Sequence, residues 1–159
     1  MPSVLITGAN RGLGLEFARQ YAADGWQVYA VCRDLSSASK LRRLANTSEN
    51  KIRIMALDVT DPASIRVASG ELDGQAIDVI INNAGVMGVR GQSIGNIDYK
   101  AWANVLGVNT MVRRGFQRRL LTTWHEASAS SSSPLRAVWD RLPTILLAAQ
   151  SPIAVQRLQ

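Results

Sequence analysis

A glycine-rich stretch near the start of the chain is the part of the sequence best suited to hold a ligand. Residues 7–14 read Thr-Gly-Ala-Asn-Arg-Gly-Leu-Gly, between an apolar run at 4–6 and an amphipathic segment at 15–23. Gly8 can adopt the positive φ of a tight turn, Gly12 lets the backbone approach a ligand, and Gly14 lets a helix pack closely on a strand. Free N–H groups at the helix start would face an anion.

The spacing of these glycines indicates which anion is bound. No Lys-Ser or Lys-Thr follows Gly14, as it would in a phosphate-binding loop of a nucleoside triphosphatase. A dinucleotide pyrophosphate therefore fits better than a nucleoside triphosphate. The alternative is a glycine-rich turn that only connects a strand to a helix.

Polar residues also stand at the ends of two later apolar runs. Asp58 and Val59 follow the run 52–57, and Asn-Asn-Ala-Gly at 82–85 follows the run 77–81. Ligands of open α/β sheets bind outside the carboxyl ends of the strands, so these residues are candidates for the same site. Asp58 could instead cap a helix or turn. A further candidate is Asn109 in the next helix, which could instead cap that helix or pair within it.

Strands and helices are predicted to alternate through the first 111 residues. The predicted strands are 4–6, 26–32, 52–57 and 77–81. The first predicted helix is 15–23, and the second is capped by Ser36 or Ser37 and has Leu41 and Leu44 on one face. The third runs from Asp61-Pro62 to about Leu72. The fourth is 99–108, with Trp102, Val105 and Leu106 facing inward.

This alternation predicts an α/β fold with a Rossmann-like parallel sheet in the strand order 3-2-1-4, which is the first half of a doubly wound fold. The fourth strand would be an unpaired edge. Such an edge favours instability or association, which includes a homo-oligomer.

Composition places the chain among globular proteins. Hydrophobic residues make up 47% of the 159 residues, and the mean hydropathy is near zero. No apolar run approaches the roughly 18 residues that cross a bilayer, and no signal peptide is recognised, so we expect a cytoplasmic protein without membrane contact. The single cysteine, Cys32, is expected to be a small buried hydrophobe, which excludes a disulfide framework. No metal site is assigned.

The net charge of +6 is spread unevenly. Residues 1–111 hold eleven Lys and Arg against ten Asp and Glu, whereas residues 112–159 hold seven Arg against two acidic residues. The second part also contains a serine run and three prolines. We therefore expect a dinucleotide-binding domain at 1–111 and an irregular, poorly ordered tail at 112–159.

Four motifs occur in the order in which the short-chain dehydrogenase/reductase family has them: the glycine stretch, the Asp58-Val59 pair, the Asn-Asn-Ala-Gly stretch and Asn109. The chain resembles this family over roughly residues 1–111, and most of all its sniffer-type carbonyl reductases and bacterial C-factor proteins. The resemblance implies that Asn109 is catalytic. The cofactor-binding residues that it implies are Thr7, Gly8, Asn10, Arg11, Gly12, Leu13, Gly14, Arg33, Asp58, Val59, Asn83, Ala84 and Gly85.

The end of the second predicted strand indicates which cofactor is used. A dehydrogenase that selects NAD places Asp or Glu about twenty residues past the glycine turn to bind the ribose 2′-OH, but here Arg33 follows Cys32. Arg11 and Arg33 could together face a 2′-phosphate, so NADP(H) is expected in preference to NAD. Arg33 could instead pair with Asp34 or be solvated.

The family's chemistry also needs a serine and a Tyr-x-x-x-Lys pair downstream of the asparagine. Here every lysine precedes Asn109 and no tyrosine follows Tyr99, while His125 is expected to be a surface residue. The expected function is therefore an oxidoreductase for small carbonyl or alcohol substrates that is catalytically impaired as written. The alternative is a non-catalytic nucleotide-binding or interaction module whose arginine-rich tail contacts nucleic acid or acidic partners; the family resemblance makes nucleic acid the less expected partner.

A second reading register accounts for the tail. In this register, each codon consists of the third base of one codon of the given sequence and the first two bases of the next codon. Codons for residues 139–159 can then be chosen so that the shifted register encodes G-S-I-A-D-N-T-S-G-G-S-I-A-Y-R-S-S-K-A-A. The missing Tyr-x-x-x-Lys appears in this string, and the serine run becomes a valine-rich strand followed by Ser-Arg-Met. We hypothesise that one base is lost after the Met111 codon and that residues 112–159 are the family's own gene translated out of frame.

Restoring that base is predicted to yield a full-length reductase. The restored residues should supply a fifth strand beside the exposed edge, so thermal unfolding should become cooperative and carbonyl reduction should appear. Phenylalanine in place of the recovered tyrosine should abolish turnover and leave NADPH binding nearly intact, because that hydroxyl acts on the transition state. Genomic DNA without this register, or a repaired protein that folds yet reduces no carbonyl compound, would contradict the hypothesis.

Overall fold

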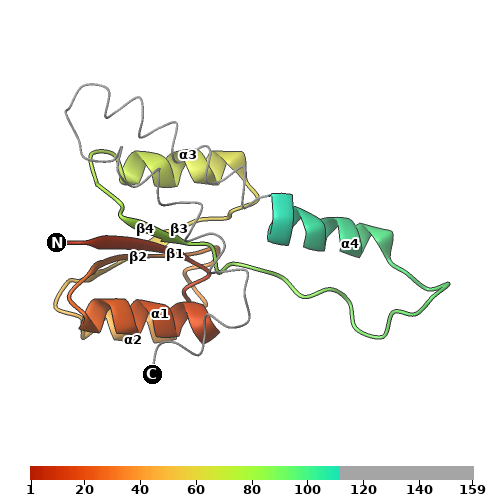
Figure 1. The fold of residues 1–159 in the computed structure, drawn as a ribbon, viewed down its shortest axis with the longest axis horizontal. Coiled ribbons are helices and arrows are strands. Elements are labelled where there is room, and N and C mark those ends of the chain that lie inside the picture. Colours follow the sequence, from red (N-terminus) through yellow and green to blue (C-terminus); the bar gives the residue numbers. More distant parts are fainter. Residues whose placement is uncertain (112–159) are drawn as a thin grey trace. The chain divides into compact units, whose positions relative to one another are not determined.

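The computed structural model describes residues 1–111 as strands and helices in alternation (Figure 1). The strands are β1 (Ser3–Thr7), β2 (Gln27–Cys32), β3 (Ile52–Ala56) and β4 (Val79–Ile81). The helices are α1 (Gly12–Ala23), α2 (Ser39–Asn46), α3 (Pro62–Glu71) and α4 (Tyr99–Leu106), and α4 continues into a π-helix (Gly107–Met111). The predictions for residues 112–159, including the irregular tail and His125, lie outside the described residues.

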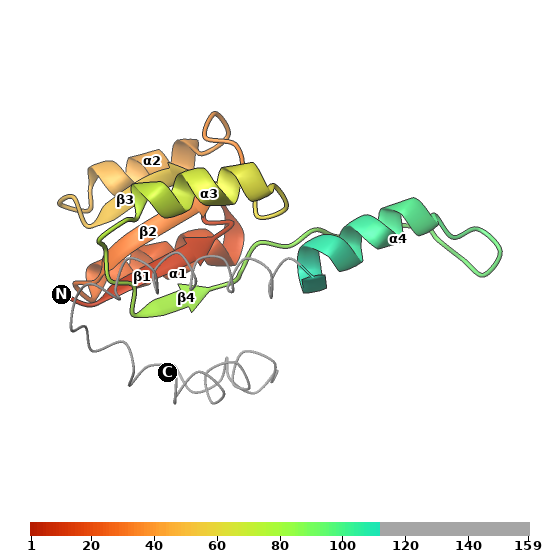
Figure 2. The same ribbon diagram turned by 90° about the horizontal axis from the view of Figure 1, so that it is seen from above.

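The four strands form one parallel sheet in the order β3-β2-β1-β4, as predicted (Figure 2). In the central register Val4 lies beside Val28 on one side and beside Val79 on the other. This confirms the α/β, Rossmann-like fold class. β4 begins two residues later than the predicted 77–81, because the Asp78 carboxylate accepts the N–H of Ser3 at 2.7 Å where the strand would start.

Helices cover both faces of the sheet. Figure 1 shows α1 and α2 on one face and α3 on the other. Along β1, the side chains of Val4 and Ile6 pack with residues of α1 and α2, whereas Leu5 packs with residues of α3. Cys32 is 3% exposed and belongs to the α1/α2 side of the core, which confirms the prediction of a buried hydrophobe. Burial on both faces explains why the strands are apolar almost throughout.

The start of α3 follows the prediction, but the start of α2 does not. Asp61 caps α3 by accepting the N–H groups of Ala63 and Ser64 at 2.8 and 3.2 Å. The residue that caps α2 is Ala38, without a side-chain hydrogen bond, so the prediction that Ser36 or Ser37 caps this helix is wrong. Both serines instead bond to Asp34, which competes for their hydroxyl groups.

The predicted inward face of the fourth helix is also wrong within the described residues. Trp102 and Leu106 of α4 are 51% and 52% exposed, and Val105 is only partly buried. The sheet formed by residues 1–111 ends at β4, so none of its strands covers these side chains.

No helix in this part of the chain combines the length and apolar character needed to cross a membrane.

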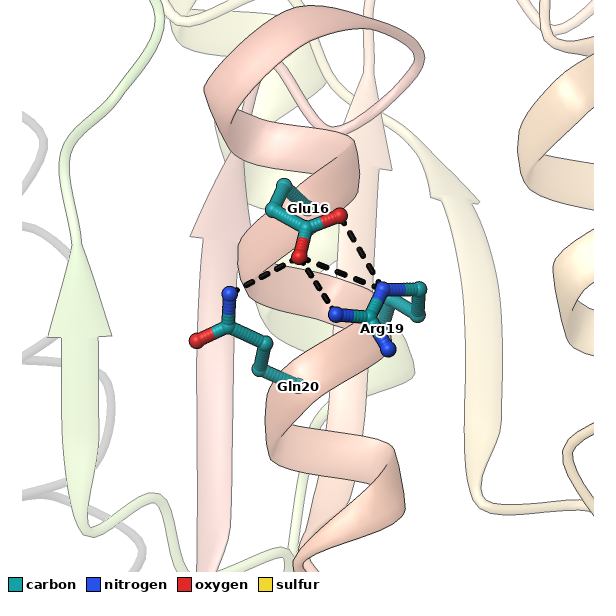
Figure 3. A network of polar contacts seen from close by, with 3 residues as sticks. All are labelled: Glu16, Arg19 and Gln20. Atoms are coloured by element: carbon teal, nitrogen blue, oxygen red, sulfur yellow. Dashed lines mark hydrogen bonds and ion pairs between the residues drawn. The ribbon is translucent and has the colours of Figure 1, made fainter. Parts of the chain in front are cut away.

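A polar network lies on the exposed side of α1 (Figure 3). The Glu16 carboxylate accepts hydrogen bonds from Nε and Nη2 of Arg19 and, at 2.8 Å, from Nε2 of Gln20. Hydrogen bonds from Arg19, and after them the one from Gln20, lower the pKa of Glu16 from its usual 4.5 to about 2. These spacings of three and four residues place the three side chains together on the helix surface.

Replacing the cation should return this carboxyl to ordinary behaviour. In Arg19→Met, the pKa of Glu16 should rise toward 4.5, as followed by NMR titration of the side-chain carboxyl. Because the pKa of Glu16 is lower in the folded than in the unfolded chain, any stabilisation by the pair is present above pH 4.5 and is lost as the pH falls toward 2. The pair is exposed, so high salt should weaken the effect. An unchanged pKa in Arg19→Met would contradict the assignment; Arg66→Met on α3 is the control.

Candidate functional site

The turn between β1 and α1 has the backbone that its glycines predict. Gly8 and Gly12 have φ of +68° and +58°, in the region that favours glycine. A Cβ built on Gly14 would lie against the carbonyl oxygen of Gly8 and 2.5 Å from Nδ2 of Asn83. Gly14 therefore allows α1 to approach the turn and the end of β4 more closely than any residue with a side chain could.

The N-terminus of α1 opens at this turn. Arg11 occupies the N-cap position with an extended backbone, and no side chain caps the helix within the described residues. Leu13 is 71% exposed, and a Cβ on Gly12 would meet nothing within 4 Å. Asn10, in the turn itself, is partly buried. Uncapped N–H groups and open space at the positive end of a helix are the features that bind an anion.

Asn83 fastens the end of β4 to this turn. Its Nδ2 donates to the carbonyl oxygens of Thr7 and Gly8 at 3.0 and 3.2 Å. The N–H of Ala84 donates to Oγ1 of Thr7 at 2.9 Å, and Thr7 Oγ1 in turn donates to the carbonyl of Ile81 at 3.4 Å. The predicted residues Thr7, Gly8, Asn83 and Ala84 are thus brought together, and a cofactor contact by Asn83 stays a prediction.

Asp58 stands at the end of β3 and closes a turn. Its Oδ1 accepts the N–H and the Oγ1–H of Thr60 at 2.8 and 2.6 Å, and its own N–H donates to Oγ of Ser64 at 2.9 Å. The turn-capping alternative is therefore realised. Every hydrogen bond that the described residues make to this carboxylate uses Oδ1, so the predicted contact with an adenine would fall to Oδ2. Val59 packs partly buried against the α3 side of the core.

In the loop after β2, Arg33 forms no ion pair with its neighbour Asp34. Oδ1 of Asp34 accepts the N–H and Oγ–H of Ser36 at 2.8 and 2.6 Å. Hydrogen bonds from Ser36, and then from Ser37, lower the pKa of Asp34. Arg33 is exposed and makes no ion pair with Asp34 or any other described acid, so the alternative of an Arg33–Asp34 pair is wrong. Arg11 is exposed as well.

Asn109 pairs with a backbone segment far from it in the sequence. It lies in the π-helix, where its Oδ1 accepts the N–H of Val86 at 3.0 Å and its Nδ2 donates to the carbonyl of Val86 at 2.9 Å. A Cβ on Gly85 would lie 3.2 Å from Oδ1 of Asn109. The alternative of a pairing within the helix is wrong, and the side-chain amide holds the segment after β4 in place. π-Helical turns are rare and occur frequently at functional sites.

Several supporting residues carry no signal in the sequence. Thr60, Ser64 and Val86 hold predicted site residues, but an exposed threonine, a helical serine and a loop valine are common everywhere. The role of Ser36 could partly have been predicted. An aspartate side chain often accepts the backbone N–H of the residue two positions later, and Ser36 stands two positions after Asp34, so this turn could have been predicted in place of a helix cap.

Comparison with known proteins assigns the chain to a family. Residues 2–128 match the family model described as short chain dehydrogenase. Human retinol dehydrogenase 12 is 43% identical over an alignment of 90 residues, which covers 53% of this chain and 28% of that protein. The short chain dehydrogenase tazN of Aspergillus terreus is 37% identical over an alignment of 128 residues, which covers 75% of this chain and 28% of that protein.

Solved structures of similar fold include enzymes of the same kind. A carbonyl reductase from Pseudomonas aeruginosa PAO1, in complex with NADP, is similar at a TM-score of 0.71 and 29% identity over 77% of this chain and 56% of its own. The KRED1-Pglu enzyme is similar at a TM-score of 0.68 and 28% identity over 80% of this chain and 53% of its own. The chain thus spans 28% of the two curated relatives and about half of these solved chains.

The family match continues past Met111, where the composition changes, and ends at residue 128. The matched residues include the glycine turn, Asn83 with its contacts, and Asn109. The same residues carry the geometry described above. By this match over most of its length, the chain belongs to the short chain dehydrogenase family.

Proposed function

We propose that the carboxyl edge of this sheet binds NADP(H), and that the chain is the nucleotide-binding part of an oxidoreductase that moves hydride between the cofactor and a small carbonyl or alcohol compound. The main observation behind the proposal is the uncapped start of α1 and its position close to the end of β4. Gly14 allows this close approach, and Asn83 bonds the end of β4 to the glycine turn. The NADP complex of the similar carbonyl reductase supports it.

The residues at the turn fit a dinucleotide. The open space beside Gly12, next to the exposed residue Leu13, leaves room for a pyrophosphate against the first N–H groups of α1. A side chain at Gly14 would remove that fit by pushing α1 away from Asn83. The nicotinamide supplies the hydride when it is bound, and the described residues contribute binding and orientation.

Charge at the end of β2 favours the phosphorylated cofactor. Arg33 is exposed and unpaired with described acids, and Oδ1 of Asp34, the one carboxylate beside it, is engaged by Ser36. A ribose 2′-OH would need an acidic acceptor here, whereas a 2′-phosphate would accept hydrogen bonds from guanidinium groups. Arg11 at the N-cap of α1 is the second such group.

The other predicted residues have positioning roles in this proposal. Asp58 offers Oδ2 to the adenine, since Oδ1 is held by Thr60. The segment from Asn83 to Gly85 would border the nicotinamide. The side chain of Asn109 bonds to the backbone of Val86, directly after that segment, and so holds the segment in place. These bonds support a positioning role for Asn109 in the proposed site.

The 159-residue chain should bind NADPH at least about tenfold more tightly than NADH, as measured by isothermal titration calorimetry. Arg33→Gln should weaken NADPH binding by roughly tenfold and leave NADH binding within about twofold, because a charge-assisted hydrogen bond to phosphate contributes about 1.5–3 kcal/mol. The 2′-phosphate is the only group that distinguishes the two ligands.

Arg66→Gln is the matched control for this experiment. Arg66 is an exposed arginine of α3, on the opposite face of the sheet, so its replacement removes the same charge away from the proposed site. Affinities for both cofactors should stay unchanged in this variant. Equal or tighter binding of NADH by the unmodified chain would contradict the NADP preference, and failure to bind either cofactor would contradict the proposed function itself.

The chain as written should bind NADPH without reducing carbonyl compounds. No tyrosine follows Tyr99 and no lysine follows Lys100, so the alkoxide that forms as hydride arrives has no proton donor from the pair that the family uses. General acid catalysis contributes about 10²- to 10⁴-fold in rate. NADPH oxidation with a reactive aldehyde or quinone should therefore stay at the level of a no-enzyme blank. Turnover at a rate ordinary for the family would overturn this.

A further inference from the structure

Several hydrogen bonds hold the turn that follows β3. The N–H of Asp61 donates to the carbonyl of Asp58 at 3.1 Å, and the N–H of Asp58 donates to Oγ of Ser64 at 2.9 Å. Thr60 adds two bonds to the Asp58 carboxylate, from its N–H at 2.8 Å and from its hydroxyl at 2.6 Å. The other bonds fix the backbone of the turn, whereas the Thr60 hydroxyl bonds, among the described residues, to the carboxylate alone.

The two bonds from Thr60 fix the rotation of the carboxylate. Both reach the same atom, Oδ1, and the described residues give no hydrogen bond to Oδ2. The χ2 torsion of an aspartate has only broad preferences, so two donors on one oxygen hold a rotation that the torsion itself would leave loose. Oδ2 is not among the buried polar atoms of residues 1–111 that lack a partner, so it is open to solvent.

Asp58 stands on the same edge of the sheet as the glycine turn. The N–H of Leu57 donates to the carbonyl of Cys32 at 2.9 Å, which joins the end of β3 to the end of β2. The N–H of Ala9 donates to the carbonyl of Val31 at 3.1 Å, which joins the end of β2 to the glycine turn. Neighbouring strands lie about 4.8 Å apart, so the end of β3 is about 10 Å from the end of β1. An adenosine whose 5′-phosphate lies at the start of α1 can therefore place its base at the end of β3.

We propose that Thr60 determines the base specificity of the nucleotide site. By holding Oδ1 of Asp58, it aims Oδ2 at the base, where the carboxylate accepts the 6-amino group of adenine and repels a 6-carbonyl group. This inference rests on the proposed function. Both oxygens of a carboxylate are acceptors. Hypoxanthine and guanine carry a carbonyl oxygen at position 6, which would place two acceptors against each other. Thr60 acts through Asp58 and is therefore a positioning residue.

Binding of NADPH and of its hypoxanthine analogue, deamino-NADPH, to the full 159-residue chain tests this role, because the two ligands differ in the purine alone. The unmodified chain should prefer NADPH by roughly tenfold, as measured by isothermal titration calorimetry. Thr60→Val should reduce this preference to about two- to threefold through weaker NADPH binding, and leave deamino-NADPH binding within about twofold. Valine keeps the N–H bond to Oδ1, so the turn should keep its backbone. Thr60→Ser keeps the hydroxyl and should keep the full preference.

Asp58→Asn provides a second, independent test. The N–H of Thr60 can only donate, so the amide oxygen should take the place of Oδ1 and the amide N–H₂ group the place of Oδ2. A donor would then face the base, and the preference should invert toward deamino-NADPH by roughly twofold or more. A role of Asp58 and Thr60 in closing the turn alone predicts no such inversion.

Thr47→Val is the matched control. Thr47 is also exposed, and its hydroxyl donates to the carbonyl of Leu44 at 3.0 Å at the end of α2. The next residue, Ser48, accepts the N–H of Ile52 at 3.2 Å, so Thr47 lies at the amino end of β3, on the opposite edge of the sheet from Asp58. Removal of its hydroxyl should change neither affinity by more than about twofold, because the two sites are independent.

Several results would overturn the role of Thr60 while the unmodified chain still binds NADPH. They are equal binding of the two ligands by the unmodified chain, a full preference in Thr60→Val, equal losses for both ligands in that variant, loss of the preference in Thr60→Ser, and a retained NADPH preference in Asp58→Asn. Absence of NADPH binding by the unmodified chain would instead defeat the proposed function, and this inference with it.

Discussion

The close approach of α1 to the end of β4 is the contact on which the candidate site depends. A Cβ at Gly14 would sit against the Gly8 carbonyl and only 2.5 Å from Nδ2 of Asn83, so neither neighbour could keep its place. Asn83 uses the same amide to hold the carbonyls of Thr7 and Gly8. Gly14 and Asn83 thus set the relative positions of the start of α1, the glycine turn and the end of β4. The uncapped N–H groups of α1 depend on both residues for their position.

Much of the fold was predictable because its signals are local or periodic. Apolar runs of strand length, alternating with helical segments, gave the correct strand order, and Asp61 followed by proline marked the start of α3. Ser36 was misplaced because a serine can cap a helix or bond a nearby carboxylate, and Asp34 decides between them. Trp102 was misplaced because an apolar helical stripe indicates that something is covered without showing what covers it.

The site was predictable to a lesser degree, and for a different reason. Glycine positions follow from backbone geometry, so the roles given to Gly8 and Gly14 are confirmed. A polar side chain at a strand end has many possible partners, and only the folded chain selects one. Asn109 shows this best: its partner, the backbone of Val86, lies 23 residues away in a loop, and no pattern in the sequence joins the two.

The residues of the candidate site all belong to the first part of the chain. The glycine turn, the ends of the strands and the loop after β2 that holds Arg33 all belong to β1–β4 and their connections. These strands form one sheet with helices packed on both faces. The Tyr-x-x-x-Lys pair that the family's reaction needs lies downstream of the position of Asn109, and here no tyrosine or lysine follows Lys100. The bonds between Asn109 and Val86 join the loop after β4 to the π-helix Gly107–Met111. The contacts that shape the proposed nucleotide site therefore lie within residues 1–111, and none of them depends on the pair that would transfer the proton.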